Sequence, residues 1–411
     1  MSRTPARELY DAVVDLEPKQ KGEIPAYAYA LVKVTYDFKS GRLAPTKAEP
    51  LRFDVYRDST LVPKQPPGSD FWVSKTATDV VIQGAAHTPG GRPQPSVEVV
   101  ARIGRFAKRI AVFGRREIAT TPEGRLRIGK PEPFSEMPLT YANAYGGLDP
   151  RVPIPEADRE QYMSLMKLGL VFDHPGGYPR NLMGKGYLVF PEPIKNMEMP
   201  NLEDPDDLLT TERLVVGSPE HWYKQPLPWC FEWTNGLMFP RELYAGYDAW
   251  FPCKDDSLLP EVRRCFIPPH LAQSMKEKDA FHPEYFQEAS LGLTLREPLS
   301  GQPVSVAGMN LDEPVVGFTL PPEPVIEIDV DGHKTTAKPL LTNLVIKPAE
   351  KKFFVVYCAK TPDLPRAFIP EVHKIIPLSV QVNRDAPIRY ETPPTVRDRL
   401  AAAQSGPGPS Q

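Results

Sequence analysis

Short runs in which apolar and polar residues alternate recur along this chain, and they predict strands rather than helices. The run Leu51–Tyr56 alternates cleanly and places Leu51, Phe53 and Val55 on one face. The run Tyr27–Phe38 is dense in β-branched and aromatic residues, which strands favour. Turn-rich sequence follows each run, so we expect an antiparallel β unit that extends to about residue 138. Further strands of this unit are predicted at Asp79–Gln83, Val97–Ile103 and Arg109–Phe113.

Turn dipeptides predict two hairpins in the second half of the chain. Asn235-Gly236 follows the alternating run Trp229–Thr234, and Asp331-Gly332 follows the run Val325–Val330. Asn-Gly and Asp-Gly supply the positive φ angles that tight hairpins require. The returning strands are predicted at Leu237–Phe239 and His333–Ala337, and two more strands at Leu341–Ile346 and Lys352–Tyr357.

One helix is predicted at Ile154–Leu168, where Tyr162, Leu165 and Met166 recur at helical spacing. The expected fold class is therefore mainly β with a few short helices, built from antiparallel sheets in sandwich- or barrel-like subdomains with Pro/Gly-rich loops. Along the chain we expect a polar leader at 1–24, an N-terminal antiparallel β unit at 25–138, a Gly/Pro/aromatic-rich middle region with one helix at 139–270, a C-terminal β unit at 271–360, and an extended tail at 361–411 that is disordered at its end.

Composition strengthens the β prediction and narrows the classes of partner. The 411 residues include 50 prolines, well over twice the ordinary usage of about 5%, and each interior proline removes a helical hydrogen bond. The formal net charge of −3 gives no electrostatic case for nucleic acid. No basic amphipathic segment favours an anionic membrane. With no signal-peptide core and no run of about 18 apolar residues, we expect a cytoplasmic protein without membrane insertion.

The cysteines and histidines do not predict a metal site. The four cysteines match no zinc module and suit reduced, buried thiols, and Cys253 and Cys265 would pair only in an oxidising setting. The seven histidines are scattered, and no two have the spacing that places both imidazoles on one helical face. We therefore predict no metal and no cofactor.

Catalytic motifs are likewise missing from the sequence. It contains no Walker-type loop, no G-x-G-x-x-G and no G-x-S-x-G elbow. Gly184-Lys-Gly186 is too short to cradle a phosphate, and a turn between Asn181 and a strand at Tyr187–Phe190 explains it better. The sequence therefore predicts no catalytic residues, and we expect a protein that is not an enzyme.

A cluster of acids leaves one enzymatic alternative open. Glu203, Asp204, Asp206 and Asp207 follow one another in a Pro-rich segment. Glycoside hydrolysis needs two carboxyl groups that face each other across a sugar, and aromatic side chains nearby would stack on sugar faces. Neighbouring acids in such a loop more often lie in solvent or cap local amides. A glycan-acting or glycan-binding β protein therefore remains an alternative.

Four of the five tryptophans fall between Trp222 and Trp250. Alternation places Trp229, Phe231 and Trp233 on one sheet face, which predicts that they are core residues. Trp222 and Tyr223 lie between prolines in a predicted loop, and they are our candidate partner-binding residues.

Several segments together resemble a known family. Lys75–Gly84, with Thr88-Pro-Gly90 after it, resembles the first signature of a bacterial family tied to type VI secretion. That family was long catalogued as a domain of unknown function, and its members are now regarded as effector adaptors or chaperones. Other segments resemble its opening strand, its central Gly-Gly signature, its Asn-Pro-x-Gly-x-Gly-aromatic motif and its Pro-Asn-acidic element: Leu31–Phe38, Pro138–Gly147, Asn181–Tyr187 and Pro200–Glu203.

The resemblance continues to about residue 357, with departures. Arg241–Trp250 resembles an Arg…Gly-Thr-Tyr-Asp-x-x-Trp element, although the Thr is missing and the Asp-to-Trp spacing is one residue shorter. Leu299–Val304 and Phe318–Pro321 resemble the closing strand pair. Leu182 replaces the usual proline of the asparagine motif, and Leu259–Phe266 stands where the family has an acidic-aromatic run.

The resemblance implies a non-enzymatic adaptor or chaperone. Such a protein binds a secreted effector protein in the cytoplasm and assists its loading onto a spike component of the type VI secretion system, without a cofactor. A structural component of the same system is a further alternative.

Overall fold

The structure is a computed structural model, and it describes residues 9–18, 25–39, 43–51, 70, 75–153, 156, 176–178, 180–181, 183–190, 193–194, 196–217, 222, 225–233, 287–362, 377–383, 385 and 388–390. Strands make up 48% of it and helical residues 6%, and none of its helices reaches seven residues. The predicted fold class, mainly β with antiparallel sheets, is confirmed. The predicted helix at 154–168 falls almost wholly outside the described residues, as do the strand at 51–56 and the turn and returning strand of the Asn235-Gly236 hairpin. The first strand of that hairpin, predicted at 229–234, is not formed in the described residues 229–233, where Trp233 makes only an isolated bridge with Ala289.

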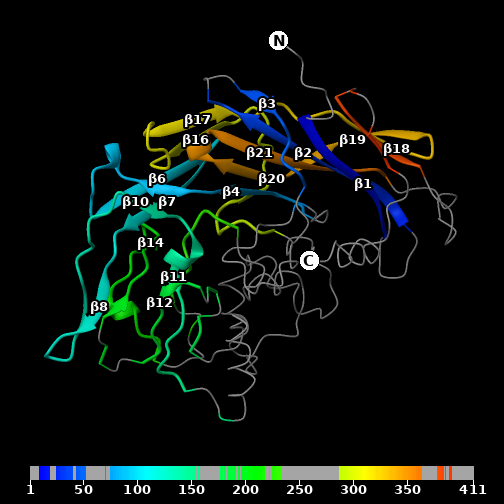
Figure 1. The fold of residues 1–411 in the computed structure, drawn as a ribbon. Helices are drawn as coiled ribbons and strands as arrows, with labels where there is room; N and C mark the ends of the chain where they lie inside the picture. The colour runs from blue at the N-terminus through cyan, green and yellow to red at the C-terminus, as the bar shows by residue number, and fades with distance from the viewer. Residues whose placement is uncertain are drawn as a thin grey trace, which may run out of the picture.

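A seven-stranded sheet forms the centre of the molecule (Figure 1). Its strands follow the order β1-β2-β21-β20-β4-β15, and β3 pairs with β2 beside this path. All neighbours are antiparallel except β20 and β4, which are parallel. The strands are β1 (Tyr10–Pro18), β2 (Pro25–Asp37), β3 (Ala44–Thr46), β4 (Thr78–Ile82), β15 (Thr294–Leu295), β20 (Pro339–Lys347) and β21 (Lys352–Lys360).

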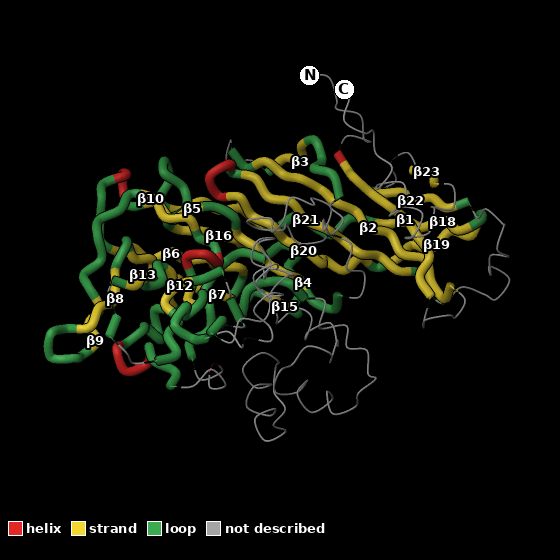
Figure 2. The backbone as a smooth tube through the Cα atoms, turned by 60° about the horizontal axis from the view of Figure 1, so that its bottom comes forward, coloured by secondary structure: helices red, strands yellow, loops and turns green. Residues whose placement is uncertain are grey.

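Two further sheets lie at opposite ends of the central one (Figures 1 and 2). The five-stranded sheet has the order β14-β7-β6-β16-β17, and the four-stranded sheet has the order β19-β18-β22-β23. Their strands are β6 (Ser96–Ile103), β7 (Phe106–Phe113), β14 (Leu202–Glu203), β16 (Pro303–Ala307), β17 (Val315–Thr319), β18 (Ile326–Val330), β19 (His333–Ala337), β22 (Leu378–Val382) and β23 (Ile388–Tyr390).

Smaller sheets and single turns of 3₁₀ helix complete the described fold. β10 pairs with β5, β11 with β12, and β8 with both β13 and β9. These strands are β5 (Ala85–His87), β8 (Glu117–Thr120), β9 (Leu126–Ile128), β10 (Glu136–Pro138), β11 (Tyr145–Gly146), β12 (Lys185–Gly186) and β13 (Met197–Glu198). The 3₁₀ turns are η1 (Pro89–Gly91), η2 (Tyr141–Asn143), η4 (Thr211–Arg213) and η9 (Pro348–Glu350).

The predicted strands at 27–38, 79–83, 97–103, 109–113, 341–346 and 352–357 are confirmed as β2, β4, β6, β7, β20 and β21. The hairpin at Asp331-Gly332 is confirmed as well, because it joins β18 to β19 with φ angles of 51° and 87°. The strand predicted at 187–190 is not formed. Leu188 makes only an isolated bridge with Val215, and the short strand of this region is β12, just before it.

The termini contribute strands where the sequence predicted none. β1 lies inside the predicted polar leader and pairs along its whole length with β2. β22 and β23 lie inside the predicted tail, and β22 pairs with β18. Strands from 25–138 and from 271–360 also share the central and five-stranded sheets. These two predicted β units are therefore interleaved in the fold.

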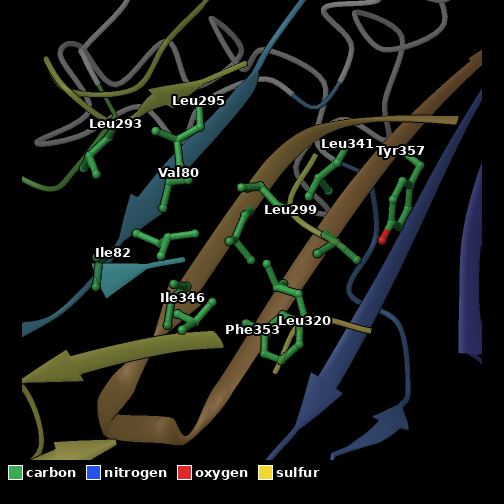
Figure 3. Packing of buried hydrophobic residues seen from close by; sticks show 14 of the residues in the cluster. Val80, Ile82, Leu293, Leu295, Leu299, Leu320, Leu341, Ile346, Phe353 and Tyr357 are labelled. Atoms are coloured by element: carbon green, nitrogen blue, oxygen red, sulfur yellow. The ribbon is translucent and has the colours of Figure 1, made fainter. Parts of the chain in front are cut away.

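One hydrophobic core joins the three larger sheets. Its buried residues include members of β1, β2, β4, β15, β20 and β21 of the central sheet, of β6, β7, β14, β16 and β17, and of β18, β19 and β22. Figure 3 shows the part of this core that lies beside β4, β20 and β21, where Val80, Ile82, Ile346 and Phe353 approach Leu293, Leu299 and Leu320. Phe353 stacks on Phe318 of β17 with ring centres 4.1 Å apart, which ties the central sheet to the five-stranded one.

The central sheet is buried on both faces, because alternate residues of its strands enter different clusters. On β4, Val80 and Ile82 belong to the large core, whereas Val81 packs with Trp233 and Phe354 on the other face. Strands covered on both faces read as continuous apolar runs, which accounts for the fully buried sequence of β4. The second face also holds buried charges, which are described below.

Candidate functional site

The sequence proposes Trp222 and Tyr223 as exposed contact residues, but Trp222 is only 8% exposed. It packs in a second hydrophobic cluster, with its ring centre 6.4 Å from that of Tyr178. The Arg180 guanidinium lies 5.2 Å from the Trp222 ring centre and donates to the carbonyl oxygen of Gln225 at 3.1 Å. A desolvated cation beside an indole ring stabilises this arrangement. Tyr223 lies outside the described residues.

Three tyrosines form the centre of this second cluster. Tyr145, Tyr178 and Tyr187 are fully or almost fully buried. The ring centre of Tyr178 lies 5.2 Å from those of both neighbours. The Tyr145 hydroxyl donates to Oε1 of Gln225 at 3.0 Å, and the Tyr178 hydroxyl donates to the Pro226 carbonyl oxygen at 2.7 Å. Burial raises the pKa of Tyr145 well above its ordinary value.

The two glycine motifs of the middle region pack directly on one another. β11 and β12 are parallel, with Tyr145 opposite Lys185 and Gly146 opposite Gly186. A Cβ atom on Gly146 would collide with the carbonyl of Asn181. Gly146 also has a φ of 148°, which side-chain-bearing residues rarely adopt. This close backbone approach explains why both segments are rich in glycine.

Asn181 holds together the two glycine motifs that pack at β11 and β12. Its amide nitrogen Nδ2 donates to the carbonyl oxygens of Tyr141 at 2.7 Å and of Tyr145 at 3.0 Å. Its own carbonyl oxygen accepts from the backbone N–H of Gly147 at 2.8 Å. Because Asn181 is fully buried, the loss of these hydrogen bonds would leave backbone groups unsatisfied.

The Pro200–Glu203 segment packs beside the same glycine motifs. The Asn201 backbone N–H donates to the Asn143 carbonyl oxygen at 2.8 Å, and Asn201 Nδ2 donates to the Phe113 carbonyl oxygen at 2.9 Å. Three segments that carry the family resemblance, Pro138–Gly147, Asn181–Tyr187 and Pro200–Glu203, therefore meet in one structural unit. We call this unit the motif node.

Three of the four acids at 203–207 are paired with arginines rather than with each other. Glu203 is buried and pairs with Arg116, and its Oε2 accepts from the Leu209 backbone N–H at 2.8 Å. Burial raises the pKa of Glu203, and the nearby Arg116 opposes that shift. At the surface, Asp206 pairs with Arg109 and Asp207 with Arg213. Each of these three carboxyl groups thus has a cationic partner.

Lys108 of β7 is a buried lysine that the sequence analysis did not single out. Its Nζ donates to Ser290 Oγ at 2.8 Å and to the Leu291 carbonyl oxygen at 2.7 Å, and it lies 4.2 Å from the Trp229 ring centre. Burial lowers the pKa of Lys108 to about 7. Burial also raises the pKa of the neighbouring Cys230 thiol to about 12, so this thiol is protonated at neutral pH.

A second buried lysine, Lys75, lies beside Trp233 on the second face of the central sheet. Its Nζ is 2.7 Å from Asp79 Oδ2 and 3.2 Å from Glu288 Oε2, and it donates to Asn343 Oδ1 at 2.7 Å. The Trp233 ring centre lies 5.3 Å away. Ions removed from water in this way need partners and hydrogen bonds to offset the loss of hydration.

Asn343 extends this buried network to a third lysine. Its Nδ2 donates to Asp70 Oδ1 at 3.3 Å, and Asp70 Oδ2 lies 2.9 Å from Lys33 Nζ. Lys33 is 0% exposed and lies 3.9 Å from the Phe354 ring centre. The network therefore crosses the second face of the sheet from β2 through β20 to β4.

Lys75 and Lys108 together hold two segments that are distant in sequence. Residues 229–233 and 287–291 lie side by side, because Trp233 bridges Ala289. Asp79 Oδ2 accepts from the Glu288 backbone N–H at 2.6 Å, and Ile82 N donates to the Phe231 carbonyl oxygen at 3.0 Å. The predicted burial of Phe231 and Trp233 is confirmed, while Trp229 is only partly buried. The prediction that all three lie on one face is wrong, because Trp229 and Phe231 pack in the main core and Trp233 packs on the second face of the central sheet. The described part of the aromatic block is therefore mostly scaffold.

The strand β17 is the most open part of the five-stranded sheet. Val315 is 57% exposed, and Gly317 and Thr319 are exposed as well. Within the described residues, β17 pairs only with β16, so its other side is a sheet edge. By resemblance, Phe318–Pro321 belongs to a closing strand pair, but the resemblance does not show that this strand is an edge. The available signal was an uncharged run between Pro314 and Pro321.

No group of three or more His, Cys, Asp or Glu residues in the described part of the chain is placed to hold a metal ion. Within the same residues, no helix is long and apolar enough to cross a membrane.

A bacterial family model described as "Uncharacterized protein conserved in bacteria (DUF2169)" matches residues 24–358. The matched range contains the motif node, the buried lysine network and β17. No curated protein matches the chain, and no solved structure does either.

Proposed function

The chain belongs to this family of uncharacterized bacterial proteins, and we propose that it is a non-enzymatic adaptor or chaperone for type VI secretion. In this proposal the protein binds an effector in the cytoplasm and assists its loading onto the secretion spike. Its chemistry is recognition of another polypeptide, without nucleotide hydrolysis. The segments that resemble the type VI adaptor family all lie within the range matched by the family model.

The motif node is the observation that carries this proposal. Residues that distinguish the resemblance, such as Gly146 and Asn181, are buried, and their backbone carbonyls accept hydrogen bonds from the backbone N–H groups of Tyr187 and Gly147. A signature made of packing residues suits a family that shares a scaffold and differs in what it binds. A signature of a shared reaction would instead place reactive groups around an open site.

The arginine pairs of the acids weigh against the glycan-acting alternative. Glu203 is enclosed with Arg116, and Asp206 and Asp207 are held by different arginines. A glycosidase would need two of these carboxyl groups to face one sugar.

Deletion of the gene tests the proposal. We expect one effector to lose stability or secretion in the deletion strain while other effectors are secreted normally, and we expect plasmid-borne wild-type protein to restore it. Secretion of every effector at wild-type level would overturn the proposal. Loss of all secretion, together with co-purification of the protein with assembled particles, would support a structural component instead.

Direct association provides the second arm of the test. Proteins encoded by neighbouring genes are co-expressed one at a time with the tagged chain, and stable complexes are identified by size-exclusion chromatography. An Asn181→Ala variant serves as a folding control. We expect it to lose binding together with thermal stability, because it disrupts the scaffold rather than a contact surface.

A further inference from the structure

We propose that the outer edge of β17 binds the effector by strand addition. An extended, uncharged segment of the effector would become the sixth strand of the five-stranded sheet. This inference rests on the proposed function, because it takes an effector as the occupant, and it assigns a location and a mode to the binding.

The hydrogen-bond pattern shows which backbone groups of β17 are available. Leu320 N donates to the Gln302 carbonyl oxygen at 2.9 Å, and Gly301 N donates to the Leu320 carbonyl oxygen at 3.0 Å. Bonding alternates along an antiparallel pair, so Phe318 and Val316 also bond toward β16. The outward N–H and C=O groups are then those of Val315, Gly317 and Thr319, the three exposed residues of the strand.

The edge also lacks the features with which proteins protect free edges. Natural edge strands carry lysines, prolines or bulges that prevent another strand from pairing. No residue of β17 is charged or proline, and its register with β16 is continuous over all five residues. By contrast, β19, the edge of the four-stranded sheet, carries His333 and Lys334.

Charge at the two ends of β17 indicates the chemistry of the occupant. Asp312 and Glu313 are exposed before the strand, and Glu323 is exposed after it. Glu313 is paired with Lys351. An effector strand with an uncharged centre and a lysine or arginine at one or both ends complements this arrangement. The exposed side chain of Leu311, 58% exposed at the preceding turn, offers apolar contact at one end.

The inward-facing residues of β17 anchor it in the core, so the strand is rigid enough to serve as a template. Its inward residues Val316 and Phe318 pack in or against the main core, and Phe318 stacks on Phe353. A rigid edge reduces the ordering cost of binding. Strand addition obtains affinity from main-chain hydrogen bonds and specificity from alternate side chains.

Two substitutions test the edge without changing the bonds to β16. Thr319→Pro removes an outward N–H, and proline is tolerated at such positions of edge strands. Val315→Lys introduces the charge with which natural edges prevent pairing. Thr336→Lys, on the exposed side of β19, is the matched control. The probes are the proteins of neighbouring genes, co-expressed singly with each variant.

We expect Thr319→Pro and Val315→Lys each to weaken the complex at least tenfold, with Thr336→Lys unchanged. Asp312→Lys should weaken it less and make the remaining binding less sensitive to salt. Circular dichroism and thermal midpoints identify any variant that fails to fold. Because the two edge variants act by different means, one folded variant is sufficient for the test.

A photo-crosslinking amino acid at Thr319, compared with one at Thr336, identifies what lies on the edge. A crosslink to the co-expressed effector only from Thr319 supports the inference. A crosslink to a second copy of this chain, or to its own C-terminal residues, would overturn it. Undiminished effector binding by both edge variants would place the contact elsewhere and leave the adaptor function standing. If wild-type protein bound no neighbouring gene product, the proposed function itself would fail.

Discussion

The two faces of the central sheet are both buried, yet they are built on different principles. One face carries Val80, Ile82, Ile346 and Phe353 into the core shared with the other sheets. The other face combines apolar residues with Lys33, Asp79 and Asn343, all almost fully buried. The apolar face stabilises the association of the sheets by burying apolar surface, and this attraction does not depend on one particular pairing of side chains. The charged face fixes the positions of particular segments, because each ion is stable only beside its own partners.

Removing a carboxylate from the charged face should give the largest loss of stability among the substitutions considered for the two faces. Asp79→Ala takes away the nearer of the two carboxylates paired with Lys75 and the acceptor for Glu288 N and Gln287 Nε2. Removing one member of a buried ion pair costs about 3–5 kcal/mol. We expect a loss of that size in the free energy of unfolding, measured by urea denaturation. Asp79→Asn, which keeps an acceptor oxygen, should lose clearly less, and equal losses for the two variants would contradict the prediction.

A cavity on the apolar face should have the next largest effect. Ile346→Ala removes a fully buried side chain from the main core. Truncations of this kind cost about 2–5 kcal/mol, and the remaining contacts repack in part. We expect about 3 kcal/mol by the same denaturation assay, with little dependence on pH or salt. A loss that changed strongly with pH would show that this face is not purely apolar in its energetics.

Lys108 sharpens the comparison, because it donates hydrogen bonds to two neutral groups, the Ser290 hydroxyl and the Leu291 carbonyl. Its pKa in the folded protein is about 7, below the ordinary value near 10.4. The unfolded chain therefore binds more protons between these values, and stability rises as pH increases through that window. From pH 7 to pH 9 we expect a gain of about 2 kcal/mol in wild-type stability.

The Lys108→Met variant isolates this contribution, since it keeps the length of the side chain and removes the charge. Relative to the variant, the wild type should gain free energy of unfolding as the pH rises from 7 to 9, so the comparison favours the variant more at pH 7 than at pH 9. Parallel pH profiles for the two proteins would contradict the lowered pKa.

The smallest effect is expected from an exposed ion pair. Lys334 Nζ lies 3.0 Å from Glu327 Oε1 on the surface of the β18–β19 hairpin. Solvent and salt screen such a pair, and the side chains lose entropy in forming it. Lys334→Ala should leave the thermal midpoint within experimental error. A measurable destabilisation would mean that exposed charges also contribute to this fold.

Local pattern predicted individual strands well, but it did not predict their pairing. The runs that became β2, β4, β20 and β21 are apolar enough to be recognised alone. Their neighbours in the sheet lie far away in sequence, as when Asn343 of β20 pairs with Asp79 of β4. β1 was missed because acidic residues interrupt its apolar pattern, as at Asp11 and Asp15.

The candidate site was the least predictable part. Trp222 lies among prolines, which indicates a loop, but its burial depends on Arg180 and Tyr178 from another segment. Lys33 is visible as the one charged residue in the interior of β2, which ends at Asp37, whereas its partner Asp70 carries no local signal. The glycine motifs were recognised as a pattern, and only the backbone contact between them explained their composition.

The bridge between Trp233 and Ala289 places two residues that are 56 positions apart in the sequence next to each other. The described strands of the three larger sheets all lie before Trp233 or after Ala289 in the sequence. Their order in the sheets therefore does not depend on how many residues separate these two positions. Lys75 and Lys108, which contact residues on both sides of this point, mark a place where chain length can change while the described strand order stays the same.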